Sequence, residues 1–171
     1  MIVVGLLAES SSAAEIARRA AAAGAKVELV GLVPGDADWD ERLFELAAAG
    51  VGHATVVRSA RTSMEAADLD LALRYLPDIR CVVLAAPPTS LLNAAMSGAD
   101  FAGASLVLVG PLDAEALAAI SSAPIVLDPP PNDADGTFAG FVAALAVRLD
   151  RGEPPESAFR ATVSALAADP A

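Results

Sequence analysis

The chain has very few of the residues that most often form crosslinks or bind metals. Among 171 residues there is one cysteine, Cys81, and one histidine, His53. A single cysteine excludes an internal disulfide, and a lone histidine without a thiol cluster is a poor signal for a metal site. Cys81 lies in an apolar run, so we expect a buried core thiol and not a nucleophile. We expect His53 in a surface or turn position between a helix and a strand.

Basic residues are also scarce, with 11 Lys and Arg against 22 Asp and Glu, and the net charge is -11. This balance argues against nucleic acid and against anionic membranes as partners. Apolar runs of membrane-spanning length are absent, and residues 1–9 lack the basic region of a signal peptide. We therefore expect a cytoplasmic protein. Arg58 and Arg61 lie in the one basic and polar loop, which is either simply solvated or a binding site for an anion.

Two common nucleotide-binding motifs are missing. A Gly-x-Gly-x-x-Gly sequence does not follow the first predicted strand, and a Walker A sequence does not occur. The sequence therefore excludes a dinucleotide fingerprint and a P-loop.

The chain does contain a regular alternation of short apolar strands and amphipathic helices. Hydrophobic residues make up 55% of the sequence and aromatic residues only 4%, so Ala, Val and Leu must fill the core. This alternation predicts a single domain over residues 1–171, an α/β fold in which helices cover both faces of a mostly parallel sheet as a three-layer α/β/α sandwich. Predicted strands lie at about 2–8, 26–33, 54–58, 80–86, 105–110 and 124–128. Predicted helices lie at about 12–23, 38–49, 68–76, 89–96, 113–121, 136–151 and 155–167.

The most informative segment is the turn before the penultimate helix. It reads Asp133-Ala134-Asp135-Gly136 and continues Thr137-Phe138-Ala139-Gly140. This segment resembles the Gly-Ala-Gly-Asp turn and the helix start of the ribokinase (PfkB) family of sugar and nucleoside kinases. The resemblance implies a site where the turn amides bind a phosphoryl group and the final Asp acts as base. A helix amino terminus suits phosphate because its amides are unsatisfied and its dipole is positive there.

The resemblance continues through other segments, which include residues 20–31, 68–88 and 132–167. It implies a ribokinase-like core, but the chain is about half the family's usual length, and three features are missing: the β lid, the magnesium-organising Asn-x-x-Glu and the nucleotide loop. Gly110 is the closest remnant of that loop and the candidate nucleotide-binding residue. At the turn itself, Gly136 replaces the catalytic base, and Asp133 and Asp135 replace the two glycines.

These departures favour a protein that has lost phosphotransferase activity and that binds a small molecule (a sugar, nucleoside or nucleotide) or another protein. Homo-oligomerisation would cover sheet edges that the missing segments expose. One alternative is a minimal kinase with Mg and ATP as cofactors, with Asp135 as base and the Ala134, Gly136 and Thr137 amides as the phosphate site. In the other, the chain is a structural subunit of a homo-oligomer. Asp135 or Asp133 is either functional or only a cap of the helix near Gly136.

Overall fold

A computed structural model describes residues 1–6, 11–61, 63–112, 118, 120, 123–131, 133 and 135–168. The strands in this part of the chain form one six-stranded sheet in the order β3-β2-β1-β4-β5-β6. Every neighbouring pair is parallel, which confirms the predicted α/β class. The strands are β1 (Ile2–Leu6), β2 (Val27–Val33), β3 (Val51–Arg58), β4 (Cys81–Ala85), β5 (Ser105–Val109) and β6 (Ile125–Leu127).

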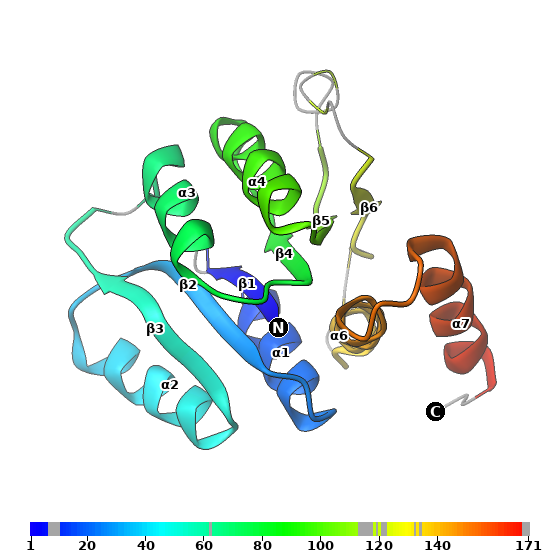
Figure 1. Cartoon of the computed structure of the whole chain (residues 1–171). Helices are drawn as coiled ribbons and strands as arrows, with labels where there is room; N and C mark the ends of the chain where they lie inside the picture. The colour runs from blue at the N-terminus through cyan, green and yellow to red at the C-terminus, as the bar shows by residue number, and fades with distance from the viewer. Residues whose placement is uncertain are drawn as a thin grey trace.

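The described helices cover both faces of the sheet, so the predicted three layers are present (Figure 1). One face packs against α1 (Ser11–Ala22), α2 (Ala37–Ala48) and α6 (Thr137–Asp150), and the other against α3 (Ala66–Tyr75) and α4 (Thr89–Ala102). The last helix, α7 (Pro155–Ala168), packs against α6 at the outer side of the molecule (Figure 1).

The two cores follow from the alternation of side chains along each strand. In β1, Ile2 and Val4 belong to the core under α1, α2 and α6, whereas Val3 belongs to the core under α3 and α4. All five residues of β4 are buried, because this strand lies in the middle of the sheet and is covered on both faces. Cys81 is fully buried there, as predicted, and burial raises the pKa of its thiol strongly.

Three element boundaries differ from the sequence prediction. β3 begins at Val51 and not near 54, because Val51 and Gly52 already pair with β2. A bulge follows before Thr55, and there the Glu28 carboxylate accepts the Ala54 amide at 2.6 Å. The prediction of a turn for His53 was therefore wrong. α3 begins at Ala66 and not at Asp68, whose carboxylate instead accepts the Glu65 amide at 3.1 Å.

The third difference is α4, which extends to Ala102 although the sequence predicted an end near residue 96. Gly98 does not end the helix, because it lies where Leu73 of α3 packs against α4 and leaves no room for a side chain. The helix predicted at 113–121 falls mostly outside the described residues. Within the described ranges, every helix is too short or too polar to cross a membrane.

Candidate functional site at the amino terminus of α6

The turn that the sequence singled out leads from β6 into α6. Gly136 is the N-cap residue, with φ 70° and ψ 17°, a left-handed conformation that glycine adopts without strain. Its amide donates to the Asp133 carbonyl at 3.0 Å, which closes the turn. α6 packs beside α1 (Figure 1), and Arg19 and Glu15 of α1 lie within 4 Å of the Cβ position of Gly136. The segment that the sequence singled out is therefore a tight turn at a helix start.

The amides at the start of α6 are already bonded to the chain's own oxygen atoms. The Asp133 carboxylate accepts the Phe138 amide at 2.8 Å and the Ala139 amide at 3.0 Å, one with each oxygen. The Asp135 carboxylate accepts the Thr137 amide at 3.1 Å. These three amides are among those that a helix leaves unsatisfied and offers to an anion. Both aspartates thus cap the helix, as the capping alternative for this turn supposed.

Asp135 is exposed, and its bonds favour the charged form. The Thr137 amide holds the pKa of the Asp135 carboxyl below its ordinary value, helped by the Thr137 hydroxyl. A carboxylate with a lowered pKa is a weaker base, and general bases work best with a pKa near the operating pH. The electrostatics of the turn therefore do not favour Asp135 as a base.

Arg19 of α1 fills the space beside the turn. Its guanidinium donates to the Asp135 carbonyl at 3.5 Å and to the Glu15 carboxylate at 2.5 Å. A Cβ on Gly136 would lie 2.7 Å from Arg19 Nη2, and one on Gly140 would lie 3.1 Å from Arg19 Nη1. Position 136, which resembles the base position of the ribokinase family, therefore has no room for a side chain unless Arg19 moves.

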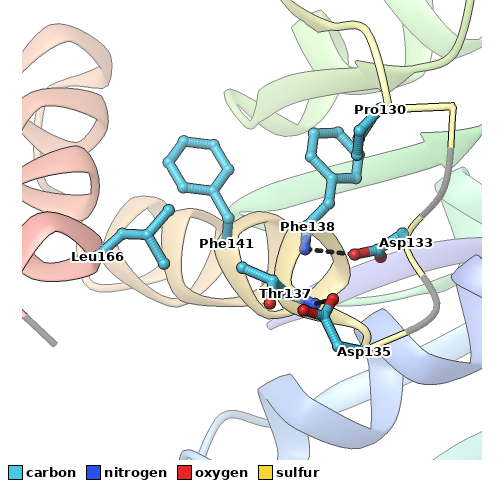
Figure 2. A pocket seen from close by; sticks show the side chains of 7 residues that line it. All are labelled: Pro130, Asp133, Asp135, Thr137, Phe138, Phe141 and Leu166. Atoms are coloured by element: carbon cyan, nitrogen blue, oxygen red, sulfur yellow. Dashed lines mark hydrogen bonds between the residues drawn. The ribbon is translucent and has the colours of Figure 1, made fainter. Parts of the chain in front are cut away.

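A groove of about 480 Å³ lies beside these caps, between α6 and α7 (Figure 2). Asp133, Asp135 and Thr137 line one end, while Phe138, Phe141 and two further apolar side chains line the rest (Pro130 and Leu166). The Phe141 and Phe159 rings meet edge to face, with centroids 5.7 Å apart, and this contact holds α7 against α6. The volume lies in the range typical of small-molecule sites, roughly 300 to 1,000 Å³.

The other predicted site residues do not all meet at this groove. Gly136 and Thr137 lie at the turn, but Ala134 falls outside the described residues. Gly110 follows β5 with φ 136°, and its amide donates to the Leu127 carbonyl at 2.9 Å. A Cβ there would lie 3.3 Å from the Ala86 backbone, so a close chain approach explains this glycine. Gly110 is not among the residues that line the groove.

The remaining candidate ligands, Arg58, Arg61 and His53, do not form a binding site for an anion or a metal ion within the described residues. Arg58 pairs with Asp40 at 2.5 Å, and Arg61 pairs with Glu65 at 3.2 Å and Asp68 at 3.0 Å, so both guanidiniums of the basic loop already have carboxylate partners. His53 Nδ1 is buried without a hydrogen-bond partner. Over the described ranges, His, Cys, Asp and Glu side chains form no group of three or more that could hold a metal ion.

Sequence reasoning missed two parts of the site. It did not identify Arg19, because only the packing of α1 on α6 brings this residue to the turn. It also did not identify the apolar wall formed by Phe138, Phe141 and Leu166. The wall had a weak signal, because aromatic residues are only 4% of the chain and two of them lie three positions apart at the start of α6.

The α/β fold of this chain matches the fold of solved ribokinases and nucleoside kinases, as the sequence resemblance implied. The chain aligns with the crystal structure of Sa239 at a TM-score of 0.69 and 12% identity, covering 99% of this chain and 91% of that one. It aligns with Arabidopsis thaliana ribokinase complexed with ribose and ATP at a TM-score of 0.64 and 16% identity, covering 96% and 87%. For the aminoimidazole riboside kinase of Salmonella enterica the TM-score is 0.63 and the identity 13%, covering 96% and 89%.

Sequence comparison adds nothing to this result. The sequence matches no family model and no curated protein. The likeness at 12% to 16% identity shows the shared fold alone.

Proposed function

We propose that this chain is a ribokinase-fold protein that does not transfer phosphate and that uses the groove between α6 and α7 to bind a small molecule. One observation carries the proposal: Asp133 and Asp135 already occupy the amides of Thr137, Phe138 and Ala139. A phosphate would have to displace two carboxylates or lie against them. A like-charge contact at roughly 4 Å costs about 1 kcal/mol in water and about 4 kcal/mol near a protein surface.

The lack of a base at position 136 supports the same proposal. Gly136 has no side chain, and its left-handed backbone and the nearby Arg19 guanidinium oppose any replacement. Asp135 is the nearest substitute, but its lowered pKa makes it a weak base. Phosphoryl transfer depends on positioning and on positive electrostatics around the phosphate, and this turn presents carboxylates instead.

The described strands support the absence of a lid. All six belong to the one central sheet, so none forms a separate small sheet over the groove. A lid excludes water from a reacting phosphate, and an open site would let water compete with the acceptor hydroxyl. The open groove therefore suits binding better than phosphoryl transfer.

A homo-oligomer is a further part of the proposal. β3 and β6 are the two edge strands, and each exposes an apolar side chain: Val57 is 55% exposed and Val126 is 40% exposed. Exposed edges with apolar side chains favour pairing with another chain. Light scattering should therefore give a mass above that of one chain, and a strict monomer at all concentrations would contradict this part.

The test of lost phosphotransfer is thermal unfolding with and without millimolar Mg-ATP, combined with a turnover assay over sugars and nucleosides. We expect no change in Tm and no turnover. The rival minimal kinase would bind Mg-ATP. A structurally similar ribokinase II from E. coli was solved in complex with ATP and Mg²⁺. At 100 times its Kd, such a ligand would stabilise the fold by about 2.7 kcal/mol. Turnover that disappears in Asp135→Asn would establish the rival.

A further inference from the structure

The groove between α6 and α7 is divided into an apolar part and an acidic end. Leu166 of α7 faces Phe141 of α6 at the apolar part, and Phe138 and Pro130 continue it toward the turn (Figure 2). Asp133 and Asp135 lie at the opposite end (Figure 2). A ligand that fills the groove would therefore meet aromatic and aliphatic carbon along most of its length and carboxylates at one end.

The charge at the acidic end is not cancelled from within the groove. The seven lining residues include two carboxylates and no basic side chain. Arg19 offsets part of this charge from outside the groove: its guanidinium donates to the Asp135 carbonyl at 3.5 Å, and it shares the Glu15 carboxylate with Arg18, each at 2.5 Å. The positive dipole of the α6 amino terminus amounts to roughly half an elementary charge, which is smaller than the charge of the two carboxylates.

We propose that the groove binds an amphipathic cation, an amine that carries an aromatic or branched apolar group, with the ammonium beside Asp135 and the apolar group between Phe138, Phe141 and Leu166. This inference names the ligand class for the binding role proposed above, and it rests on that role. The chemistry of both ends is complementary to such a ligand.

Anions and neutral ligands match the groove less well. An anion would face the two carboxylates that exclude phosphate from the turn. A neutral alcohol of the same shape would gain the apolar contacts but no charge-assisted hydrogen bond, which is about twice as strong as a neutral one. A carboxylate has about four lone-pair sites, so Asp135 keeps acceptor capacity after it has bonded to Thr137.

The experiment is a calorimetric titration of the full chain with three matched probes: 2-phenylethylamine, 2-phenylethanol and 3-phenylpropionate. We expect the amine to bind about tenfold or more tightly than the alcohol, and the carboxylate not to bind. Asp135→Asn should weaken the amine about tenfold and leave the alcohol unchanged. Leu166→Ala should weaken both. The matched control Asp38→Asn, which changes an exposed acid in the first turn of α2, should change neither.

Each result decides the inference. Equal binding of amine and alcohol, preference for the carboxylate, or no binding of any probe would overturn it. Amine binding that survives Asp135→Asn would also overturn it, and thermal unfolding of each variant shows whether the fold is intact. Failure here is distinct from failure of the proposed function, because Mg-ATP binding with turnover would overturn the latter whatever the amine does.

Discussion

Two of the helices in the described ranges, α2 and α6, begin with aspartate caps, and they differ in how many helix-start amides the caps bind. At α2 the Asp36 carboxylate accepts one amide, that of Trp39, at 2.9 Å. At α6 two carboxylates accept three amides, and Asp133 alone holds two of them. One capping acid is enough to begin a helix. The second acid at α6 therefore does more than begin the helix: the two carboxylates together occupy three amides of the helix start, and the Thr137 amide is one of those that the ribokinase resemblance implies for phosphate.

The backbone conformation of the N-cap residue also differs between α2 and α6, and this difference gives the largest expected change in the free energy of unfolding. α2 begins from Asp36 with φ -118°, whereas α6 begins from Gly136 with φ 70°. Gly136→Ala should destabilise the protein by about 2 to 3 kcal/mol, because a left-handed residue with a Cβ costs about 1 to 2 kcal/mol and Arg19 must also move. Urea unfolding measures this change.

The matched control for that variant is Gly152→Ala. Gly152 has φ 85°, but no atom lies within 4 Å of its Cβ position. We expect about 1 kcal/mol of destabilisation there, from the backbone alone. Equal losses at the two positions would show that the contact with Arg19 contributes nothing.

The second prediction compares the caps directly. Asp133→Ala should cost about 1 to 2 kcal/mol and Asp36→Ala about 1 kcal/mol, since Asp133 bonds two amides and Asp36 bonds one. Urea unfolding of both variants at neutral pH checks the order. A larger loss at Asp36 than at Asp133 would contradict the two-amide cap.

The smallest effect concerns pH. The pKa of Asp135 is lower in the folded chain, chiefly because of the Thr137 amide, so the unfolded state binds a proton more readily. The Asp135 contribution to stability is therefore present above its ordinary pKa of about 4 and is lost as the pH falls through the lowered value. Urea midpoints measured between pH 6 and pH 3 should fall less steeply in Asp135→Asn than in the parent chain. An unchanged slope would show that Asp135 is not held in this way.

Much of the fold could be predicted because its signals are local. Gly152 and Pro154 separate the last two helices, and apolar runs with β-branched residues mark the strands, so element order and class followed from the sequence. α4 extends beyond its predicted end near residue 96, and the glycine in the added part, Gly98, is explained by a tertiary contact, the packing of Leu73. The prediction for β3 was also too short. Its bulge involves a contact with the neighbouring strand, in which the Glu28 carboxylate accepts the Ala54 amide, and no local pattern shows this contact.

The candidate site was predictable in part. The aspartates before a helix indicated caps, and both carboxylates do accept amides at the start of α6. Three features could not be predicted: the hydrogen bonds from two amides to the Asp133 carboxylate, the position of Arg19, and the contribution of Leu166 to the apolar wall of the groove. Each depends on where α1, α6 and α7 lie in space, which no local pattern specifies.

The most direct test of the central claim is a two-dimensional ¹H–¹⁵N NMR titration with Mg-ATP and with inorganic phosphate, following the amides of Thr137, Phe138 and Ala139. Because Asp133 and Asp135 already hold these amides, we predict that their resonances stay unchanged up to millimolar concentrations of either ligand. A saturable shift of these three resonances would contradict the account, since it would show that an anion displaces the carboxylates and reaches the helix start.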